Sequence, residues 1–414
     1  MNRTCDERDT QRSNAPEIFS REPFEQFYAR VLADASLQEK LRAPADIEQF
    51  IALLVETGRE CGFAFGVDDA RAAINARSPL AKGLVDGAVR ETPLPPKGWL
   101  PVRTSWHDGQ LYAHWLYFGQ RRFSEPFFES EIQRANFRPF NRLFRYSTPI
   151  TKLGDWLREH PGLRPNGFIF HMSRCGSTLV SQMLAALARN IVISEAASID
   201  TVVRARQVRP DLSEDQQALW LTWMIGALGQ RRGDSESNYF IKLDCWHTLA
   251  LPLFRRAFPD VPWIFMYRDP VEVLVSQMRM PGMHMIPGAL GSGQFGVSLS
   301  DSLENREGYC ARVLAGVCEP VLQQYSKDKT LLVDYRQLPQ AVCTAILPHF
   351  GIEYSDSDRA TMVEAARYDA KTPNFEFVPD TETKQRSATA GVRAAAGEHL
   401  GEIYRHLEAL RIGA

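Results

Sequence analysis

The sequence predicts an α/β fold whose largest part is a three-layer, doubly wound parallel sheet. Two observations carry this prediction. The second half of the chain alternates short apolar runs with longer helical segments, and each run is apolar throughout, as in strands buried on both faces. The predicted strands are Phe168–His171, Ile191–Ser194, Tyr239–Leu243, Trp263–Tyr267 and Leu331–Val333. Crossover helices fit between them, and ligands bind such sheets at the carboxyl ends of the strands.

Ahead of the sheet, the sequence predicts a small all-α domain over residues 21–80, after a polar tail over residues 1–20 that we expect to be disordered. The apolar residues that recur at helical spacing include Phe24, Phe27, Val31, Phe50 and Leu54. Ser36 and Glu39 have the spacing of a capping box for the second helix, and Gly62 marks the end of the third. We therefore expect three short helices in succession.

A proline-rich stretch, RETPLPPKGWLP, predicts a linker over residues 81–104, because regular elements do not tolerate such a density of proline. Residues 105–160 follow as an accessory region, in which Asp108-Gly109 predicts a hairpin with a primed turn. The aromatic residues of this region form either core or a patch that faces a substrate; they include Trp106, Trp115, Phe127 and Phe128.

The composition argues against several classes of partner. Lys and Arg number 48 and Asp and Glu 50, so no overall charge favours nucleic acid or a membrane surface. The start of the chain lacks the apolar stretch of a secretory signal, and no segment is apolar for long enough to span a bilayer. The seven cysteines form no C-x-x-C pair, which favours reduced thiols, a cytoplasmic location and no structural metal.

The stretch GFIFHMSRCGSTLVSQML predicts an anion site. A strand that ends at His171 and a helix that begins near Ser177 direct backbone N–H groups and the helix dipole at one point. Gly176 permits close approach of the backbone, and Arg174 adds a permanent positive charge. Ser177 and Thr178 add hydroxyl donors or serve only as a helix cap. The loop does not have the Walker A pattern of nucleoside triphosphatases.

The stretch WIFMYRDPVEVLVSQMRM predicts a second anion site at the same edge of the sheet. Arg268 ends the strand, Asp269-Pro270 begin a helix, and Ser276 lies eight residues after the arginine. Arg268 and Ser276 can therefore share one oxyanion. Two anion sites along one edge indicate a ligand with phosphate groups at both ends.

The segments SRCGSTLVS and YRDPVEVLVS resemble those of the sulfotransferase family, over about residues 160–414. The resemblance implies a sulfotransferase domain over residues 161–414, a sheet of P-loop type, 3′-phosphoadenosine 5′-phosphosulfate (PAPS) as co-substrate, and no metal. It places around the 5′-phosphosulfate Arg174, Cys175, Gly176, Ser177 and Thr178, with Arg174 at the leaving phosphate, and around the 3′-phosphate Arg268, Ser276 and Lys384. The Arg-Lys-Gly triplet of the family is absent near Lys384.

Three residues are candidates for the base that takes the acceptor proton. Similar proteins carry a glutamate facing the acceptor at the position of Glu195, and cytosolic sulfotransferases carry a catalytic histidine at the position of Asp244. We rank Glu195 first, Asp244 second and His247, in the next helical turn, third. Each carboxylate has an alternative role as a helix cap or a salt bridge to Lys242.

The amino-terminal segment FEQFYARVLADASLQEKLRAPADIEQFIALLVETGRECGFAFGVDDAR resembles the nif-eleven-type leader-peptide domain over about residues 20–76. The resemblance implies docking of a substrate, partner or carrier protein. An ordinary helical bundle is the alternative.

The sequence thus predicts a sulfotransferase that moves a sulfuryl group from PAPS to a hydroxyl or amine of a small molecule or peptide by in-line transfer. The alternatives are a P-loop phosphotransferase of kinase-like type and a non-catalytic nucleotide-binding interaction protein. The methionines of SQMRMPGMHMIPG form either an adaptable wall for the acceptor or core.

Overall fold

The computed structural model describes residues 21–77, 91–291 and 294–413, so the predicted tail and residues 81–90 of the predicted linker lie outside the described residues. The described chain forms two compact units. The first contains residues 21–77 together with Phe137–Phe144, and the second contains residues 91–136 and 145–413.

The first unit is all-helical, as the sequence predicts. Its helices are α1 (Arg21–Ala33), α2 (Ala35–Arg42), α3 (Ile47–Glu60), α4 (Val67–Arg77) and α6 (Pro139–Leu143). The short α6 comes from a distant part of the sequence and contacts α2, α3 and α4. It buries Phe140 and Leu143 completely or nearly so, which the sequence analysis did not anticipate because it placed this segment in the accessory region.

The predicted capping box of the second helix is wrong. Helix α2 begins at Ala35, and its N-cap is Asp34, whose Oδ1 accepts hydrogen bonds from the backbone N–H groups of Ser36 (3.0 Å) and Leu37 (3.2 Å). The N-cap therefore lies two positions before the predicted one, and Ser36 lies inside the helix.

The second unit opens with a three-stranded antiparallel sheet in the order β1-β2-β3, formed by β1 (Trp99–His107), β2 (Gln110–Tyr117) and β3 (Tyr146–Pro149). The predicted hairpin turn is confirmed, since Asp108 and Gly109 both have positive φ, of 47° and 73°. The linker prediction is wrong over residues 99–104, which belong to β1. Pro101 fits there because the register of β1 shifts between Pro101 and Arg103.

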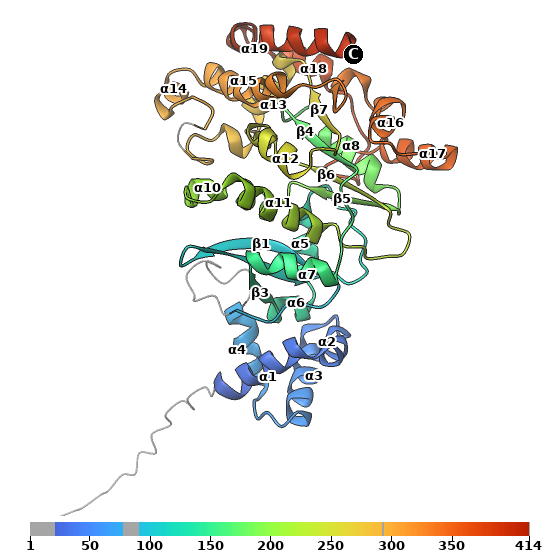
Figure 1. The fold of residues 1–414 in the computed structure, drawn as a ribbon. Coiled ribbons are helices and arrows are strands. Elements are labelled where there is room, and N and C mark those ends of the chain that lie inside the picture. The colour runs from blue at the N-terminus through green and yellow to red at the C-terminus, as the bar shows by residue number, and fades with distance from the viewer. Residues whose placement is uncertain (1–20, 78–90, 292–293, 414) are drawn as a thin grey trace, which may run out of the picture. The chain divides into compact units, whose positions relative to one another are not determined.

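The predicted parallel sheet is present, with five strands in the order β5-β6-β4-β7-β8 (Figure 1). The strands are β4 (Gly167–His171), β5 (Asn190–Ser194), β6 (Asn238–Lys242), β7 (Trp263–Tyr267) and β8 (Thr330–Asp334). The first strand in the chain, β4, lies at the centre, so the connections run outward from it in both directions. This topology places a ligand site beside β4, at the carboxyl edge.

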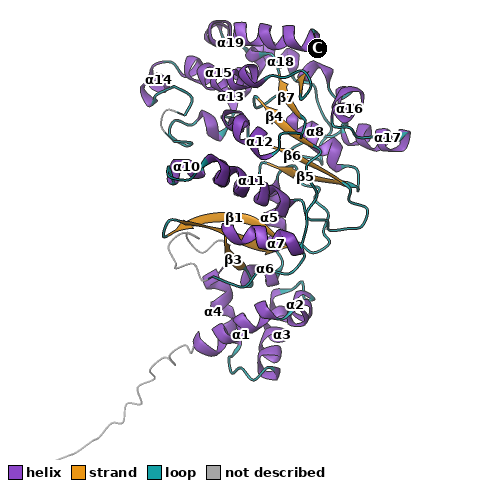
Figure 2. Cartoon of the chain, in the orientation of Figure 1, coloured by secondary structure: helices purple, strands orange, loops and turns teal. Residues whose placement is uncertain are grey.

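Helices cover both faces of this sheet (Figure 2). On one face, Phe254 packs edge-to-face on Phe168 and Phe170, with ring centroids 5.4 Å apart in both pairs. On the opposite face Phe350 packs so closely that a Cβ at Gly167 would lie 2.2 Å from its ring. A glycine is therefore required where β4 begins.

The remaining helices of the second unit are α5 (Phe128–Asn136), α7 (Leu153–Glu159), α8 (Ser177–Ala185), α9 (Ala197–Val203), α10 (Ala205–Val208), α11 (Glu214–Leu228), α12 (Leu251–Ala257), α13 (Pro270–Arg279), α14 (Leu299–Glu304), α15 (Arg306–Gln324), α16 (Leu347–His349), α17 (Asp356–Ala365), α18 (Thr381–Ser387) and α19 (Ala390–Ile412). Strand β1 contacts α9 and α11, so the antiparallel sheet joins the helical layer of the α/β part. No helix among the described residues is long and apolar enough to cross a membrane.

Candidate active site

The carboxyl ends of all five parallel strands meet at one cavity of about 660 Å³. Each strand end supplies at least one lining residue: Arg174 after β4, Glu195 after β5, Asp244 after β6, Arg268 after β7 and Tyr335 after β8. The cavity therefore lies where a doubly wound sheet is expected to hold its ligand.

The loop between β4 and α8 has an unusual backbone. Ser173 and Arg174 have positive φ, of 75° and 53°, which is rare for residues with a side chain. Gly176 is the N-cap of α8, with φ 86°, and no side chain caps the helix. No side-chain cap takes the N–H groups of Ser177 and Thr178 at the start of α8, and this end of the helix is open to an anion. The reading of Ser177 and Thr178 as a mere helix cap is therefore not supported.

Two interactions fix this loop. The buried Cys175 thiol donates to the carbonyl oxygen of Met266 at 3.1 Å, and burial raises its pKa to about 12, so it is not a nucleophile. The guanidinium of Arg174 donates to the carbonyl oxygen of Met280 at 2.6 Å. Arg174 thereby lies beside the methionine-rich segment that follows α13, in which Met280 and Met283 are exposed and line the cavity while Met285 is buried.

Glu195 is held in a charged cluster behind the mouth of the cavity. It has a positive φ of 54° and forms a salt bridge with Lys242, whose side chain is fully buried. His171 Nε2 lies 3.6 Å from the same carboxylate. Burial opposes ionisation of Glu195, but the charge of Lys242 outweighs it and holds the pKa of this carboxyl well below its usual range.

Asp244 has the opposite environment. It lies in the cavity wall at the N-terminus of a 3-10 helix, and its backbone carbonyl oxygen accepts from His247 N–H at 3.0 Å. Its carboxyl group does not cap that helix and makes no hydrogen bond with another described residue. Burial raises the pKa of its carboxyl to about 7. His247 does not line the cavity; its Nε2 lies 3.0 Å from Asp200 Oδ1 and 3.9 Å from Asp244 Oδ2.

Among the described residues, Asp200, Asp244 and His247 are the group that can offer ligands to a cation, because their ligand atoms all lie within 4.8 Å of one another. Asp200 is already engaged, since Trp246 Nε1 donates to its Oδ1 at 2.7 Å. We therefore interpret Asp200 and His247 as residues that surround the Asp244 carboxyl, and not as ligands of a metal ion.

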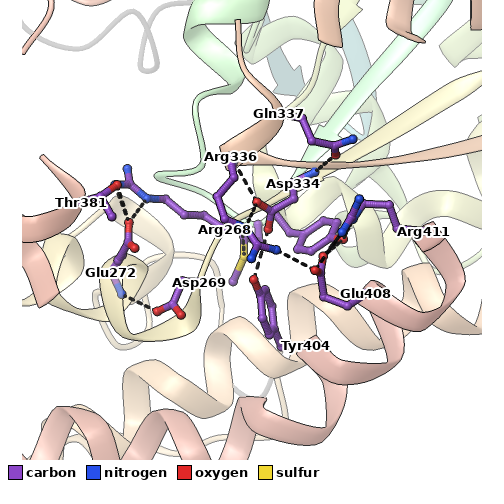
Figure 3. Close-up of polar contacts among 12 residues, drawn as sticks. Arg268, Asp269, Glu272, Asp334, Arg336, Gln337, Thr381, Tyr404, Glu408 and Arg411 are labelled. Atoms are coloured by element: carbon purple, nitrogen blue, oxygen red, sulfur yellow. Dashed lines mark hydrogen bonds and ion pairs between the residues drawn. The ribbon is translucent and has the colours of Figure 1, made fainter. Parts of the chain in front are cut away.

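Arg268 is paired with carboxylates (Figure 3). Its Nε donates to Glu272 at 2.6 Å, and its Nη2 lies 2.7 Å from Asp380 and 3.2 Å from Thr381. Lys384 is also bound to Asp380, at 2.7 Å. The predicted 3′-phosphate site thus contains two cations and two anions, and the sequence analysis did not anticipate the anions.

Hydrogen bonds and ion pairs of its two neighbours in the sequence hold Tyr335 beside Arg268. The guanidinium of Arg268 lies 3.8 Å from the centroid of the Tyr335 ring. On either side of Tyr335, Asp334 accepts from Arg336 Nε at 2.6 Å, and Arg336 is paired with Glu408 of α19 at 2.6 Å (Figure 3). Helix α19 therefore holds the end of β8 in place beside the cavity.

The cavity brings together every residue that the sequence analysis selected for the donor site and both carboxyl candidates for the base, but not His247. These residues are Arg174, Cys175, Gly176, Ser177, Thr178, Glu195, Asp244, Arg268, Ser276 and Lys384. Residues that the sequence analysis missed as part of the site include Lys371, Tyr335 and Trp246. Of the accessory aromatic residues, Phe127 lines the cavity, whereas Trp115 and Phe128 are buried in the core. No signal in the sequence marked Lys371.

Similar solved structures share little sequence with this chain. They include the sulfotransferase domain from the curacin biosynthetic pathway (16% identity, 57% of this chain and 98% of that chain, TM-score 0.39). Two others are the sulfotransferase domain of the Synechococcus PCC 7002 olefin synthase (16%, 61% and 96%, TM-score 0.34) and a sulfotransferase from Alicyclobacillus acidocaldarius (16%, 60% and 96%, TM-score 0.36). No curated protein matches the chain.

Two family models match separate parts of the sequence. Residues 20–69 match the Nif11 domain, and residues 165–356, which hold the five parallel strands, match the sulfotransferase family. The chain therefore carries a Nif11 domain ahead of a sulfotransferase domain, and it is an enzyme of the sulfotransferase class.

Proposed function

We propose that this enzyme transfers a sulfuryl group from PAPS to a hydroxyl or amine acceptor by in-line displacement. The observation that carries the proposal is that one cavity contains both an uncapped helix N-terminus beside Arg174 and a buried carboxyl, Asp244, without a hydrogen-bonding partner among the described residues. The first stabilises negative charge on a leaving phosphate, and the second is placed to accept a proton.

The two ends of the cavity fit PAPS to different degrees. At the 5′ end, Gly176 and the first turn of α8 present N–H groups without a side-chain cap, next to Arg174. At the 3′ end, Arg268 and Lys384 are both paired with Asp380. A doubly charged phosphate binds there once Asp380 gives up these contacts, because the two cations are otherwise neutralised.

PAPS, when bound, supplies a sulfuryl group attached to a phosphate leaving group. Arg174 and the N–H groups of α8 stabilise the charge that develops on the leaving oxygen. Asp244 takes the acceptor proton, because its pKa of about 7 matches a general base that works near neutral pH. Glu195 stays ionised and holds Lys242 at the back of the cavity. This assignment places Asp244 ahead of Glu195, reversing the order that the sequence favours.

Part of the cavity lining is apolar. The apolar lining residues include Phe127, Trp246, Met280 and Met283. We therefore propose an acceptor that carries an apolar or aromatic body next to its hydroxyl or amine. The reaction needs no metal in this scheme. The cysteine pattern and near-neutral net charge support a cytoplasmic reaction without nucleic-acid or membrane partners.

Reverse transfer tests the proposal without knowledge of the natural acceptor. The chain is mixed with p-nitrophenyl sulfate and adenosine 3′,5′-bisphosphate, and release of nitrophenolate is followed with and without a chelator. We expect release in both conditions. Tight binding of ATP with magnesium, together with no binding of the bisphosphate, would instead favour the phosphotransferase alternative.

Binding measurements separate the two ends of the donor site. Calorimetry with the bisphosphate should show that Arg268→Ala and Ser276→Ala each weaken binding by about 1–3 kcal/mol, as expected for loss of a hydrogen bond to a charged group. Arg174→Ala should lower turnover more than bisphosphate affinity, because its contact strengthens as charge develops. Equal affinity of the wild type for AMP and for the bisphosphate contradicts a 3′-phosphate site.

A further inference from the structure

The segment between α17 and α18 forms a compact loop at the mouth of the cavity. An isolated bridge pairs Tyr368 with Glu376. Two backbone hydrogen bonds close the loop, from Asp369 N–H to the Phe375 carbonyl oxygen at 2.7 Å and from Phe377 N–H to the Arg367 carbonyl oxygen at 2.8 Å. The loop is therefore a hairpin-like element that its own backbone hydrogen bonds hold together.

The turn at the tip of this loop is fixed by one carboxylate. Asp369 Oδ1 accepts from the N–H of Lys371 at 3.0 Å, from the N–H of Thr372 at 2.8 Å and from the Thr372 hydroxyl at 2.7 Å. Because three donors converge on one oxygen, the backbone of Lys371 is held in a single conformation.

Lys371 lines the same cavity as Arg174 and Glu195. In the part of the chain that the structure describes, its ammonium group makes no ion pair and no hydrogen bond. Lys371 is an exposed residue of the cavity wall. Partial desolvation there lowers the pKa of its ammonium group, the charges of Arg174 and Lys242 lower it further, and the carboxylates of Glu195 and Asp369 raise it. The charge of Lys371 therefore interacts with the charge of Arg174 in the same cavity.

Arg174 and Lys371 line one cavity. Like charges in one cavity repel, and an anion placed between them relieves the repulsion. The carboxylate of Glu195 is already bound to Lys242. The remaining positive charge, on Arg174 and Lys371, suits a group with several oxygens and delocalised negative charge. A sulfuryl group in transfer is such a group.

We propose that Lys371 is a catalytic residue that contacts the oxygens of the transferred sulfuryl group. This inference rests on the proposed function. In the step, the bond from sulfur to the leaving phosphate oxygen breaks and its electron pair stays on that oxygen, near Arg174. A bond forms from sulfur to the acceptor oxygen or nitrogen, and the acceptor proton passes to Asp244. Lys371 keeps its own proton and neutralises charge on the sulfuryl oxygens.

Substitution of Lys371 tests this role against a matched control in the same loop. Arg367 is exposed and paired with Glu364 at 3.2 Å, and it does not line the cavity. Arg367→Gln therefore removes the same charge from the same loop. We expect Lys371→Gln to lower kcat of the reverse transfer by about 10- to 100-fold, Lys371→Arg to restore part of it, and Arg367→Gln to change little.

PAPS and adenosine 3′,5′-bisphosphate differ only in the sulfuryl group, so the affinity of the variants for the bisphosphate gives a second test. We expect Lys371→Gln to change bisphosphate affinity less than threefold, because the bisphosphate lacks the group that Lys371 contacts. A loss of bisphosphate affinity as large as the loss of kcat would overturn the proposal, as would equal kcat for Lys371→Gln and Arg367→Gln.

Chemical labelling of Lys371 does not depend on turnover. The unaltered chain is treated with an amine-reactive ester, and modification of Lys371 is measured by mass spectrometry with PAPS, with bisphosphate or with neither. PAPS should protect Lys371 more than the bisphosphate does; equal labelling in all three samples would overturn the proposal. If PAPS protects Lys371 but the wild type transfers no sulfuryl group, the contact stands and the proposed function fails.

Discussion

Glu195 and Asp244 follow neighbouring strands and face the same cavity, yet their surroundings act on them in opposite ways. Lys242 keeps Glu195 ionised, whereas burial without a hydrogen-bonding partner raises the pKa of Asp244 to about 7. Pairs of carboxyls with separated pKa values are a common basis for acid and base roles in one site. At the scale of single residues, the environment therefore distinguishes two carboxyl groups that the sequence ranks in the opposite order.

The pH dependence of turnover tests the choice of Asp244. The ionised form of Asp244, which acts as the base, accumulates as pH rises through about 7. A plot of kcat of the forward transfer against pH should therefore have a limb that rises around pH 7 and then levels off. Asp244→Asn should lower kcat by about 10²- to 10⁴-fold and remove the limb. Glu195→Gln should instead shift the limb to lower pH, because the charge of Glu195 helps to raise the pKa of Asp244. A limb that survives in Asp244→Asn contradicts the assignment.

Stability gives a second measure of the same group. The pKa of Asp244 is higher in the folded chain than in the unfolded chain, where it is about 3.9. Folding therefore binds a proton between these pH values, and the stabilising contribution of Asp244 is lost as pH rises from about 4 to about 7. Asp244→Asn should gain stability relative to the wild type on going from pH 5 to pH 8, by about 3 kcal/mol at most, since about two of the three pH units between the two pKa values lie above pH 5. Thermal unfolding at both pH values measures this difference.

Removal of the Asp380 charge is predicted to tighten the binding of adenosine 3′,5′-bisphosphate. It is paired with both Arg268 and Lys384, and the proposed 3′-phosphate has to displace it. Asp380→Asn should raise the affinity for adenosine 3′,5′-bisphosphate by about threefold to tenfold, a small gain because Asp380 is partly exposed. Glu382→Gln, an equal change of charge in the same helix, should have little effect. Weaker binding by Asp380→Asn would mean that the carboxylate arranges the two cations for the ligand.

At the scale of elements, much of the parallel sheet and its ligand edge could be predicted. The middle of each strand is apolar because both faces of the sheet are buried, and the stretches around Arg174 and Arg268 follow the neighbouring strands β4 and β7. The position of Lys371 could not be predicted in this way. It comes from a loop that no periodicity marks, and it reaches the cavity through the turn that Asp369 holds.

Helix α6 is a similar case, because short helices with only five residues leave no periodic pattern in the sequence. Its neighbours in space, α2, α3 and α4, are more than 60 residues away in the chain. The prolines of the predicted linker obscured β1 in the sequence, since a shift of register lets Pro101 lie within a strand.

The packing of α6 predicts that the first unit stays assembled after its chain is cut. A protease site is inserted within residues 78–90, and the cleaved protein is analysed by size-exclusion chromatography. The fragment that contains α1 to α4 should remain bound to the rest through the buried Phe140 of α6. Phe140→Ser should release it, because loss of a buried phenylalanine costs about 3–5 kcal/mol. Phe137→Ser, at a residue 82% exposed, is the matched control and should not release it.

At the scale of the whole molecule, the chain combines a domain that matches the Nif11 family with a sulfotransferase domain whose proposed donor and acceptor sites lie in one cavity of the second unit. All residues that line this cavity belong to the second unit. We infer that chemistry does not require the first unit and that the first unit serves to capture an acceptor or its carrier. Such capture raises the effective concentration of the acceptor without any change at the site of transfer.

Removal of the first unit tests this inference, and α6 determines how the truncated chain is designed. A chain that starts at Glu91 exposes the apolar side of α6, so Phe140, Leu143 and Phe144 are replaced by polar residues to prevent aggregation. We expect bisphosphate affinity and reverse transfer from p-nitrophenyl sulfate to stay within about twofold of the full chain. Labelling of the natural acceptor in an extract of the source cells, with radioactive PAPS, should fall at low enzyme concentration and recover as the enzyme concentration is raised, because capture affects encounter rather than turnover. The full chain with the same three substitutions controls for their effect on folding. If the truncated chain loses bisphosphate binding while that control retains it, the first unit supports the catalytic fold and docking is not its role.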